Sequence, residues 1–344
     1  MTIASTLGPV MADVAGTALT DDDATRLQDP LIGSIILFAR NYESPAQLRA
    51  LTAQIKALRS PQLLIAVDHE GGRVQRFQEG FTKIPPMRDL GTLWDRSLEE
   101  GRMAAREIGY VIGAELGAHG IDFSFTPVLD LDWGASGVIG HRAFHRKPEA
   151  VAELAGALIA GLHEAGTVAC GKHFPGHGHV RADSHHEIPR DDRNREEIFA
   201  DDLIPFALLA AELDSIMPAH VIYEAIDSRP AGFSPVWLQQ ILRKDLGFDG
   251  ILFSDDLTME GASVAGGIVD RAEAAFAAGC DIVPVCNNLP LCDQLLAGLQ
   301  SRGYVVPVGL APRLERLRYR GNAAAMQDTR YRAALATLAK FDLI

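Results

Sequence analysis

PEAVAELAGALIAGLHEAGTVACG, residues 148–171, is a long helical pattern followed directly by a short apolar run. Apolar residues recur with helical spacing over Pro148–Glu164, whereas Val168–Gly171 is short and β-rich. A strand that alternates with a helix in this way is typical of βα units built around a parallel sheet. The stretch therefore predicts an α/β fold.

The same alternation extends in both directions along the chain. The other predicted strands are Gly8–Val14, Ile32–Phe38, Leu63–Val67, Phe123–Val128, Ser215–Met217, Gly250–Phe253 and Asp281–Val285. The other predicted helices are Pro45–Leu58, Leu98–Ala118, Arg195–Leu213, Pro235–Leu246, Asp270–Ala278, Ala311–Arg320 and Asp328–Lys340.

Eight strands in this arrangement predict a TIM-type (β/α)8 barrel. An open doubly wound sheet is disfavoured because the first turn, ADVAGTAL, lacks the GxGxxG spacing of a nucleotide-binding turn. The sequence has no internal repeat and no Pro/Gly/Ser-rich linker. We therefore expect a single α/β-barrel catalytic domain over residues 1–344.

Composition narrows the class of protein. The formal net charge is −13 over 344 residues, which argues against a nucleic-acid partner or an anionic membrane. The four cysteines form no CxxC pair, and buried free thiols are expected. We see no signal-peptide pattern and no apolar run long enough to span a membrane, so we expect a cytoplasmic protein.

Polar residues follow the predicted strands, where barrel enzymes build their active sites. They are Asp68, Asp130, Lys172, His173, His220, Asp255 and Asn287. One aspartate after a strand is more often a helix cap, but so many such positions favour a site.

VDHEGGRVQRF, residues 67–77, places Asp68 and Glu70 before the Gly71–Gly72 pair. Two glycines after a strand allow the backbone to turn sharply over the barrel mouth. A carboxylate there can accept hydrogen bonds from vicinal sugar hydroxyls, and an arginine can brace it. A surface turn with an ordinary ion pair is the simpler alternative.

GKHFPGHGHVRADSHHEIPRDD, residues 171–192, is rich in histidine. Pro175 and Gly176 separate His173 from His177, so the two cannot share a helix face as the ligands of an HExxH zinc site do. We therefore expect no metal. Asp183 lies two residues before His185, and a neighbouring carboxylate tunes an imidazole for proton transfer.

FSDDLTMEGA, residues 253–262, has two adjacent aspartates after a buried strand. Because side chains alternate along an extended chain, only one of Asp255 and Asp256 is expected to point into the mouth. The other can cap the following helix or bond locally. A carboxylate held at the mouth can act as a nucleophile toward an anomeric carbon.

Together these segments resemble glycoside hydrolase family 3, in particular its single-domain β-N-acetylglucosaminidases of Gram-negative bacteria. The resemblance lies in KHFPGHG (172–178), DSH (183–185), IILFARNY (35–42), VDHEGGRVQRF (67–77), VIGHRAF (138–144), AHVIY (219–223) and FSDDLTMEGA (253–262), and it covers nearly the whole chain. His69 departs from the pattern, since relatives commonly have glutamine there.

The resemblance implies a role for each matched residue. Asp255 matches the catalytic nucleophile, His185 the general acid/base and Asp183 its partner. Asp68, Arg76, Arg142, Lys172 and His173 match sugar-binding positions. No cofactor is implied.

The resemblance also implies the biology. The reaction is retaining hydrolysis of terminal β-linked N-acetylglucosamine (GlcNAc) through a covalent glycosyl-enzyme. The substrates are muropeptide-type fragments such as GlcNAc-anhydromuramyl species, in peptidoglycan recycling, which links the enzyme to cell-wall biogenesis, cell shape and cell division. The single domain favours a monomer.

Three alternatives stay open from the sequence. Phosphate could replace water as the acceptor, since a histidine acid/base would not repel that anion. A metal-dependent hydrolase would be sensitive to a chelator. A non-catalytic sugar-binding protein would be expected to lack one of Asp255, His185 and Asp183, and this chain has all three.

Overall fold

The computed structural model describes residues 6–134, 136–181 and 188–344. Most of its strands belong to two sheets in which all neighbouring strands are parallel. The first sheet has the order β12-β1-β2-β3-β6, with β12 Val283–Pro284, β1 Val10–Ala12, β2 Ile32–Leu37, β3 Leu64–Val67 and β6 Phe123–Ser124. The second has the order β11-β9-β7, with β11 Ile251–Leu252, β9 Ser215–Pro218 and β7 Cys170–Phe174.

Single parallel bridges connect the two sheets at both edges. At one edge Phe123 of β6 pairs with Val168 ahead of β7, and Val128 after β6 pairs with Lys172 of β7. At the other edge Phe253 after β11 pairs with Ile282 ahead of β12. The rings of Phe123 and Phe253 also lie 5.9 Å apart, so the two sheets share one apolar core. Two small pairs lie outside these sheets: β4 His69–Gly71 with β5 Val74–Gln75, and β8 Arg190–Asp191 with β10 Ile222–Tyr223.

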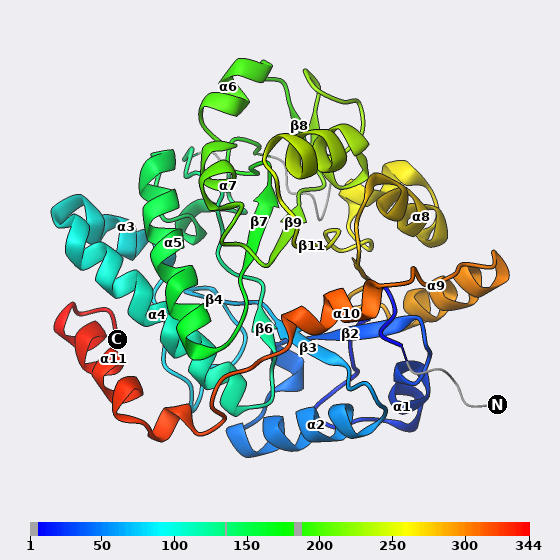
Figure 1. Cartoon of the computed structure of the whole chain (residues 1–344), viewed down its shortest axis with the longest axis horizontal. Helices are drawn as coiled ribbons and strands as arrows, with labels where there is room; N and C mark the ends of the chain where they lie inside the picture. The colour runs from blue at the N-terminus through cyan, green and yellow to red at the C-terminus, as the bar shows by residue number, and fades with distance from the viewer. Residues whose placement is uncertain (1–5, 135, 182–187) are drawn as a thin grey trace.

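Helices alternate with the strands along the chain, as Figure 1 shows. They are α1 Asp21–Leu27, α2 Pro45–Ala57, α3 Met87–Arg96, α4 Leu98–Ala118, α5 Pro148–Ala165, α6 Arg195–Ala200, α7 Ile204–Leu209, a π-helix η4 Val236–Asp245, α8 Ile268–Ala278, α9 Leu289–Ser301, α10 Leu310–Leu314 and α11 Thr329–Lys340. Short 3₁₀ turns are η1 Ala39–Asn41, η2 Gly140–Arg142, η3 Ala231–Phe233, η5 Glu260–Ala265, η6 Glu315–Leu317 and η7 Ala325–Gln327. Helices α3, α4, α5 and α11 gather on one side of the molecule (Figure 1). The predicted α/β class is confirmed.

Local sequence explains where the central helices begin and end. Pro148 occupies the first turn of α5, where its missing N–H costs no hydrogen bond, and Gly166 ends the helix in the left-handed conformation at φ 87°. Ser44 and Ser97 cap α2 and α4 by accepting hydrogen bonds from the N–H groups of Gln47 and Glu100.

Two predicted helices are wrong in extent. Arg195–Leu213 is divided into α6 and α7, with Pro205 in the first turn of the second helix. Ala311–Arg320 ends early because the N–H groups of Tyr319 and Arg320 donate to the distant Asp122 side chain and Gly166 carbonyl instead of to the helix.

One predicted strand is also misplaced. β7 begins at Cys170 and runs to Phe174, so Lys172 and His173 lie within the strand and not after it. Val168, where we expected the strand to begin, makes only an isolated bridge.

Candidate active site

A cavity of about 960 Å³ opens at the carboxyl ends of the strands. Every strand predicted after the first contributes a residue to its wall, from the strand itself or from the residues that follow it. The residues with polar or charged side chains are Arg40, Asp68, Arg73, Arg76, Arg142, Lys172, His173, His177, Arg181, Asp255, Asp256, Thr258 and Asn287.

The glycine pair after β3 shapes one side of this cavity. Gly71 and Gly72 have φ of 115° and 53°, and a Cβ at Gly71 would lie 2.5 Å from the Pro85 carbonyl oxygen. These positions therefore require glycine, as the sequence predicted. The resulting β4–β5 hairpin keeps Asp68 and Glu70 beside the end of β7.

Lys172 joins the two carboxylates of this hairpin. Its Nζ lies 2.7 Å from Asp68 Oδ1 and 2.7 Å from Glu70 Oε1. Glu70 also receives two hydrogen bonds of 2.8 Å from the Arg142 guanidinium. Arg76 approaches the second oxygen of Asp68 at 3.4 Å. Two carboxylates and three cations from three separate segments thus form one ion-pair network beside the cavity.

This network keeps its members ionised. Burial alone would raise the pKa of Asp68 and of Glu70, but the nearby cations hold both below their ordinary values. Burial opposes the charge of Lys172, yet Asp68 and Glu70 raise its pKa above the ordinary value. Asp68 therefore presents a carboxylate, which can accept two hydrogen bonds from hydroxyl groups of a ligand.

His173 is held from behind by Asp130, which follows β6. The Nδ1 atom of His173 lies 2.7 Å from Asp130 Oδ2, and the other oxygen of Asp130 accepts the backbone N–H groups of His173 and His177. Asp130 is fully buried, so its role is to orient His173 toward the cavity.

The two adjacent aspartates after β11 differ in their surroundings. Asp256 accepts hydrogen bonds from the N–H and Oγ1 of Thr258 and from the N–H of Cys286. Burial raises its pKa to about 6. Among the described residues, Asp255 accepts a side-chain hydrogen bond of 2.8 Å from the Asp256 N–H, and it is half-buried on the cavity wall. The local bonding predicted for one member of the pair belongs to Asp256, although Asp256 also contacts the cavity.

The structure brings together most of the residues predicted from the sequence. Asp255, Asp68, Arg76, Arg142, Lys172 and His173 all line this one cavity. Asp183 and His185 lie outside the described residues. The catalytic and binding roles of all eight remain predictions.

The sequence reading missed two contributors. Glu70 was noted beside the glycine pair but not chosen, although it organises Lys172 and Arg142. Arg40, after β2, reaches the cavity and is fixed by hydrogen bonds of 2.5 Å to Asn287 and to Asp13. Its position directly after a predicted strand was the available signal.

Two further features, a membrane-spanning helix and a metal site, can be assessed in the described part of the chain. Within it, no helix is long and apolar enough to cross a bilayer. A group of three potential metal ligands occurs there at His179, Asp191 and Asp192, none of which lines the cavity.

Comparison with known proteins identifies relatives over most of the chain. The N-terminal domain of glycosyl hydrolase family 3 matches residues 7–307. A β-hexosaminidase of Thiobacillus denitrificans is 61% identical over 295 residues, which cover 86% of this chain and 82% of the relative. A β-hexosaminidase of Chromobacterium violaceum is 57% identical over 321 residues, covering 93% and 89%.

The chain is also similar to solved structures of this family. NagZ from Neisseria gonorrhoeae in complex with N-trifluoroacetyl-D-glucosamine is 52% identical, with a TM-score of 0.91 and 98% of each chain covered. The same protein in complex with a zinc ion is 50% identical, with a TM-score of 0.90 and the same coverage.

Proposed function

This chain belongs to glycosyl hydrolase family 3 and is a β-hexosaminidase, and from this premise we propose that it releases terminal β-linked GlcNAc with net retention. The observation that carries the proposal is that Asp255 shares one cavity with the Asp68–Lys172 pair. A nucleophilic carboxylate and a holder for sugar hydroxyls must both reach the same bound sugar.

We propose a reaction in two steps. In the first, Asp255 attacks the anomeric carbon while His185 gives a proton to the departing glycosidic oxygen, and a covalent glycosyl-enzyme forms. In the second, His185 takes a proton from water, which attacks the anomeric carbon and releases Asp255. Asp183 orients His185 and stabilises its cation.

The sugar is held by the remaining cavity residues in this proposal. Asp68 accepts hydrogen bonds from two hydroxyls, while Lys172 and His173 donate to sugar oxygens. Arg76 and Arg142 complete the set. Because Glu70 already receives two bonds from Arg142, we assign Arg142 mainly to fixing this wall.

We also propose that the strands form a single (β/α)8 barrel within one domain over residues 1–344. Support comes from the pairing pattern, in which isolated parallel bridges join the five-stranded and three-stranded parallel sheets at both of their edges. The contact of 5.1 Å between Phe125 and Phe253 supports it as well, because these residues belong to different sheets.

For the leaving group we propose a muropeptide-type fragment. Among the described residues, the cavity wall carries six cationic side chains, Arg40, Arg73, Arg76, Arg142, Lys172 and Arg181, against the carboxylates of Asp68, Asp255 and Asp256. In a chain with net charge −13 such a wall is unusual, and it favours an acidic aglycone. Anhydromuramyl fragments are acidic. We propose that the protein recycles them in the cytoplasm, and that the single domain acts as a monomer.

The decisive experiment labels the nucleophile. We expect mass spectrometry after incubation with a 2-deoxy-2-fluoro or 5-fluoro glycosyl donor to find the sugar on Asp255, with fragmentation separating it from Asp256. Asp255→Asn and Asp255→Ala should nearly abolish turnover and leave the circular dichroism spectrum unchanged. Labelling at Asp256, or near-normal turnover in either variant, would refute the assignment.

Two further measurements separate the remaining roles. His185→Ala should slow substrates with poor leaving groups much more than activated aryl glycosides, because only the former need strong protonation in the first step. Equal losses would contradict an acid role. Product analysis with and without phosphate identifies the acceptor. Hydrolysis gives the free sugar, whereas phosphorolysis would give a sugar 1-phosphate.

A further inference from the structure

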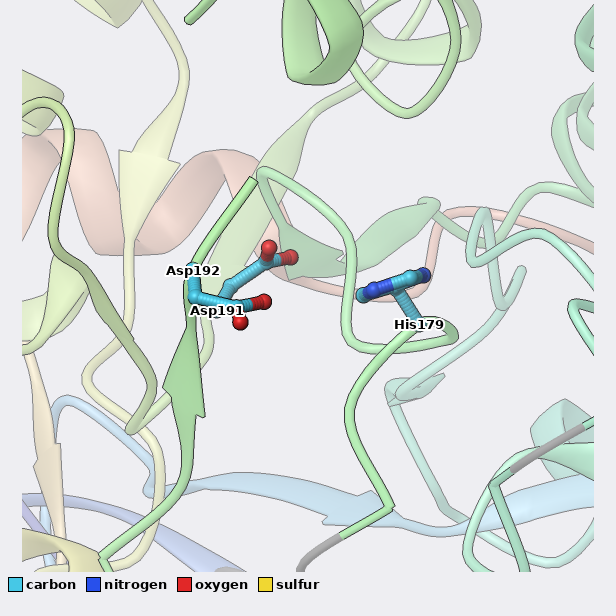
Figure 2. A group of neighbouring side chains, drawn as sticks. All are labelled: His179, Asp191 and Asp192. Atoms are coloured by element: carbon cyan, nitrogen blue, oxygen red, sulfur yellow. The ribbon is translucent and has the colours of Figure 1, made fainter. Parts of the chain in front are cut away.

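Three potential metal ligands meet beside the active-site cavity without lining it. His179 lies on the segment after β7, while Asp191 ends β8 and Asp192 follows it. Figure 2 shows both carboxylates extending from their segment toward the one that carries the His179 imidazole. One nitrogen of His179 and one oxygen of each aspartate all lie within 4.8 Å of one another.

Neighbouring side chains hold the imidazole in place. Trp133 contacts the His179 ring edge-on, with ring centroids 5.0 Å apart. The Trp133 ring is itself covered by the guanidinium of Arg146 at 3.4 Å, and its Nε1 donates to Asp202 Oδ1 at 3.0 Å. A neutral imidazole held in this way offers one ring nitrogen to a cation.

Asp191 is oriented in a similar way by Arg193. This fully buried carboxylate accepts hydrogen bonds from the N–H, Nε and Nη2 of Arg193, and Arg193 is shared with Asp202 through a hydrogen bond of 2.6 Å. The Nε atom also lies 3.2 Å from the second oxygen, so Arg193 contacts both oxygens of Asp191 and fixes the orientation of the carboxylate. Such outer partners usually accompany the ligands of real metal sites.

The charges of this cluster are not balanced. The cluster contains the carboxyl groups of Asp191 and Asp192, and Arg193 joins Asp191 to a third, that of Asp202. Arg193 supplies one positive charge, so two negative charges are left over, which suits a divalent cation. Arg146 is engaged separately by Asp201 at 3.3 Å.

We propose that His179, Asp191 and Asp192 bind one divalent transition-metal ion, with zinc as the ion that fits best. One imidazole and two carboxylates form a donor set that zinc accepts with a water as fourth ligand. Donor atoms at roughly 2.0–2.2 Å from one ion lie at most about 4.4 Å apart. A small rotation of the exposed Asp192 therefore completes the site.

This proposed site differs from the sequence-based expectation of no metal. Calcium is disfavoured, because it takes six to eight oxygen ligands and rarely an imidazole. The proposal does not depend on the glycosidase mechanism, because none of its three ligands belongs to the cavity wall.

The test is a zinc titration of the full chain after dialysis against a chelator, followed by calorimetry. We expect one zinc ion per chain, and a drop in affinity of at least about 10-fold in His179→Ala and in Asp192→Asn. Asp192 is exposed, so its substitution should not disturb folding. His163→Ala is the matched control, because His163 also contacts a carboxylate, Asp214 at 2.7 Å, but belongs to no group of three ligands within the described chain.

Two readouts locate the ion. Cobalt(II) in place of zinc should give a visible spectrum that His179→Ala removes and His163→Ala retains. Saturation of the cavity with GlcNAc should leave zinc affinity unchanged. The proposal is overturned if zinc does not bind, if it binds His179→Ala as tightly as wild type, or if GlcNAc displaces it.

Discussion

Glu70 illustrates how one side chain can organise a site without touching the reacting atoms. It is buried, and it bonds to Arg142 with both oxygens and to Lys172 with one. Its negative charge partly neutralises the positive charges of Lys172 and Arg142, because a buried charge without a partner is costly. Lys172 and Arg142 are therefore held apart and kept aimed at the cavity by a residue that we expect no substrate to contact.

The isosteric variant Glu70→Gln tests this role. It removes one charge and leaves Arg142 and Lys172 undercompensated, so we expect a loss of about 3–5 kcal/mol in the free energy of unfolding, measured by urea denaturation. kcat/KM should fall on the order of 100-fold as Lys172 moves. Glu224→Gln is the control, since its ion pair with Arg190 is exposed and should contribute at most about 0.5 kcal/mol. An unfolding free energy within 1 kcal/mol of wild type would show that Glu70 is dispensable.

At the level of single residues, the sequence was informative where chemistry follows directly from chain position. Asp68 and Asp255 come directly after apolar strands, and both reach the cavity. Glu70 could not be assigned in this way because its partners lie 72 and 102 positions away in the chain. That proximity is a property of the folded sheet and not of any local pattern.

Asp130 connects two elements, since it follows β6 and fixes the end of β7. The three hydrogen bonds that it accepts hold the His173 ring and the turn that contains His177. Burial opposes its ionisation, but His173 and His177 together lower the pKa of Asp130. The carboxylate thus fixes which nitrogen of His173 carries the proton.

Asp130→Asn should therefore loosen β7 while keeping its length. The amide would present an N–H group to one of its present donors, so at least one of the three hydrogen bonds is lost, at a cost of about 1.5–3 kcal/mol for a charged acceptor. We expect weaker binding of GlcNAc by calorimetry and a fall in kcat/KM of about 100-fold. Asp132→Asn is the control, since within the described chain the Asp132 carboxylate accepts a hydrogen bond from the nearby Gly134 N–H alone. Unchanged GlcNAc affinity in Asp130→Asn would separate His173 from sugar binding.

Elements were predictable where the signal that ends them is local. Pro148 and Gly166 bracket α5, and the prediction came within one residue of its end. The break between α6 and α7 was missed because apolar periodicity continues through it. Tertiary hydrogen bonds fix the break, since Asp202 lies within it and accepts hydrogen bonds from Arg193 and Trp133.

At the scale of the whole molecule, net charge describes the active site poorly. The chain carries −13, yet its main cavity is walled by more cations than carboxylates. The net value predicts no nucleic-acid partner, but it does not reveal the acidic aglycone that we propose. The α/β class followed from the alternation of strands and helices, whereas the positions of the cations required the fold.

The buried His69 makes the stability of the whole molecule depend on pH. His69 is buried between the rings of Phe77 and Phe81, 5.6 Å from each, and its Nδ1 has no hydrogen-bond partner among the described residues. Burial, reinforced by Arg76, lowers its pKa to about 3. Between pH 6.5 and 3 the unfolded chain therefore binds a proton at this position that the folded chain does not.

The sign of the effect follows from this difference. A base whose pKa is depressed by folding contributes stability that is present above its unfolded pKa of about 6.5 and is lost as pH falls toward the folded value. Between pH 7.5 and 5.0 the loss from His69 alone is about 2 kcal/mol. His69→Gln should therefore reduce the drop in unfolding free energy over this range by about that amount, measured by urea denaturation at both pH values. Asp256 and Asp202, whose pKa values are raised to about 6, act in the opposite direction, but they cancel because both proteins contain them. The exposed His141 provides the control, since His141→Gln changes a side chain that is solvated in the folded and unfolded chains alike. If the wild type and His69→Gln lose the same stability on acidification, His69 already takes up its proton in the folded protein.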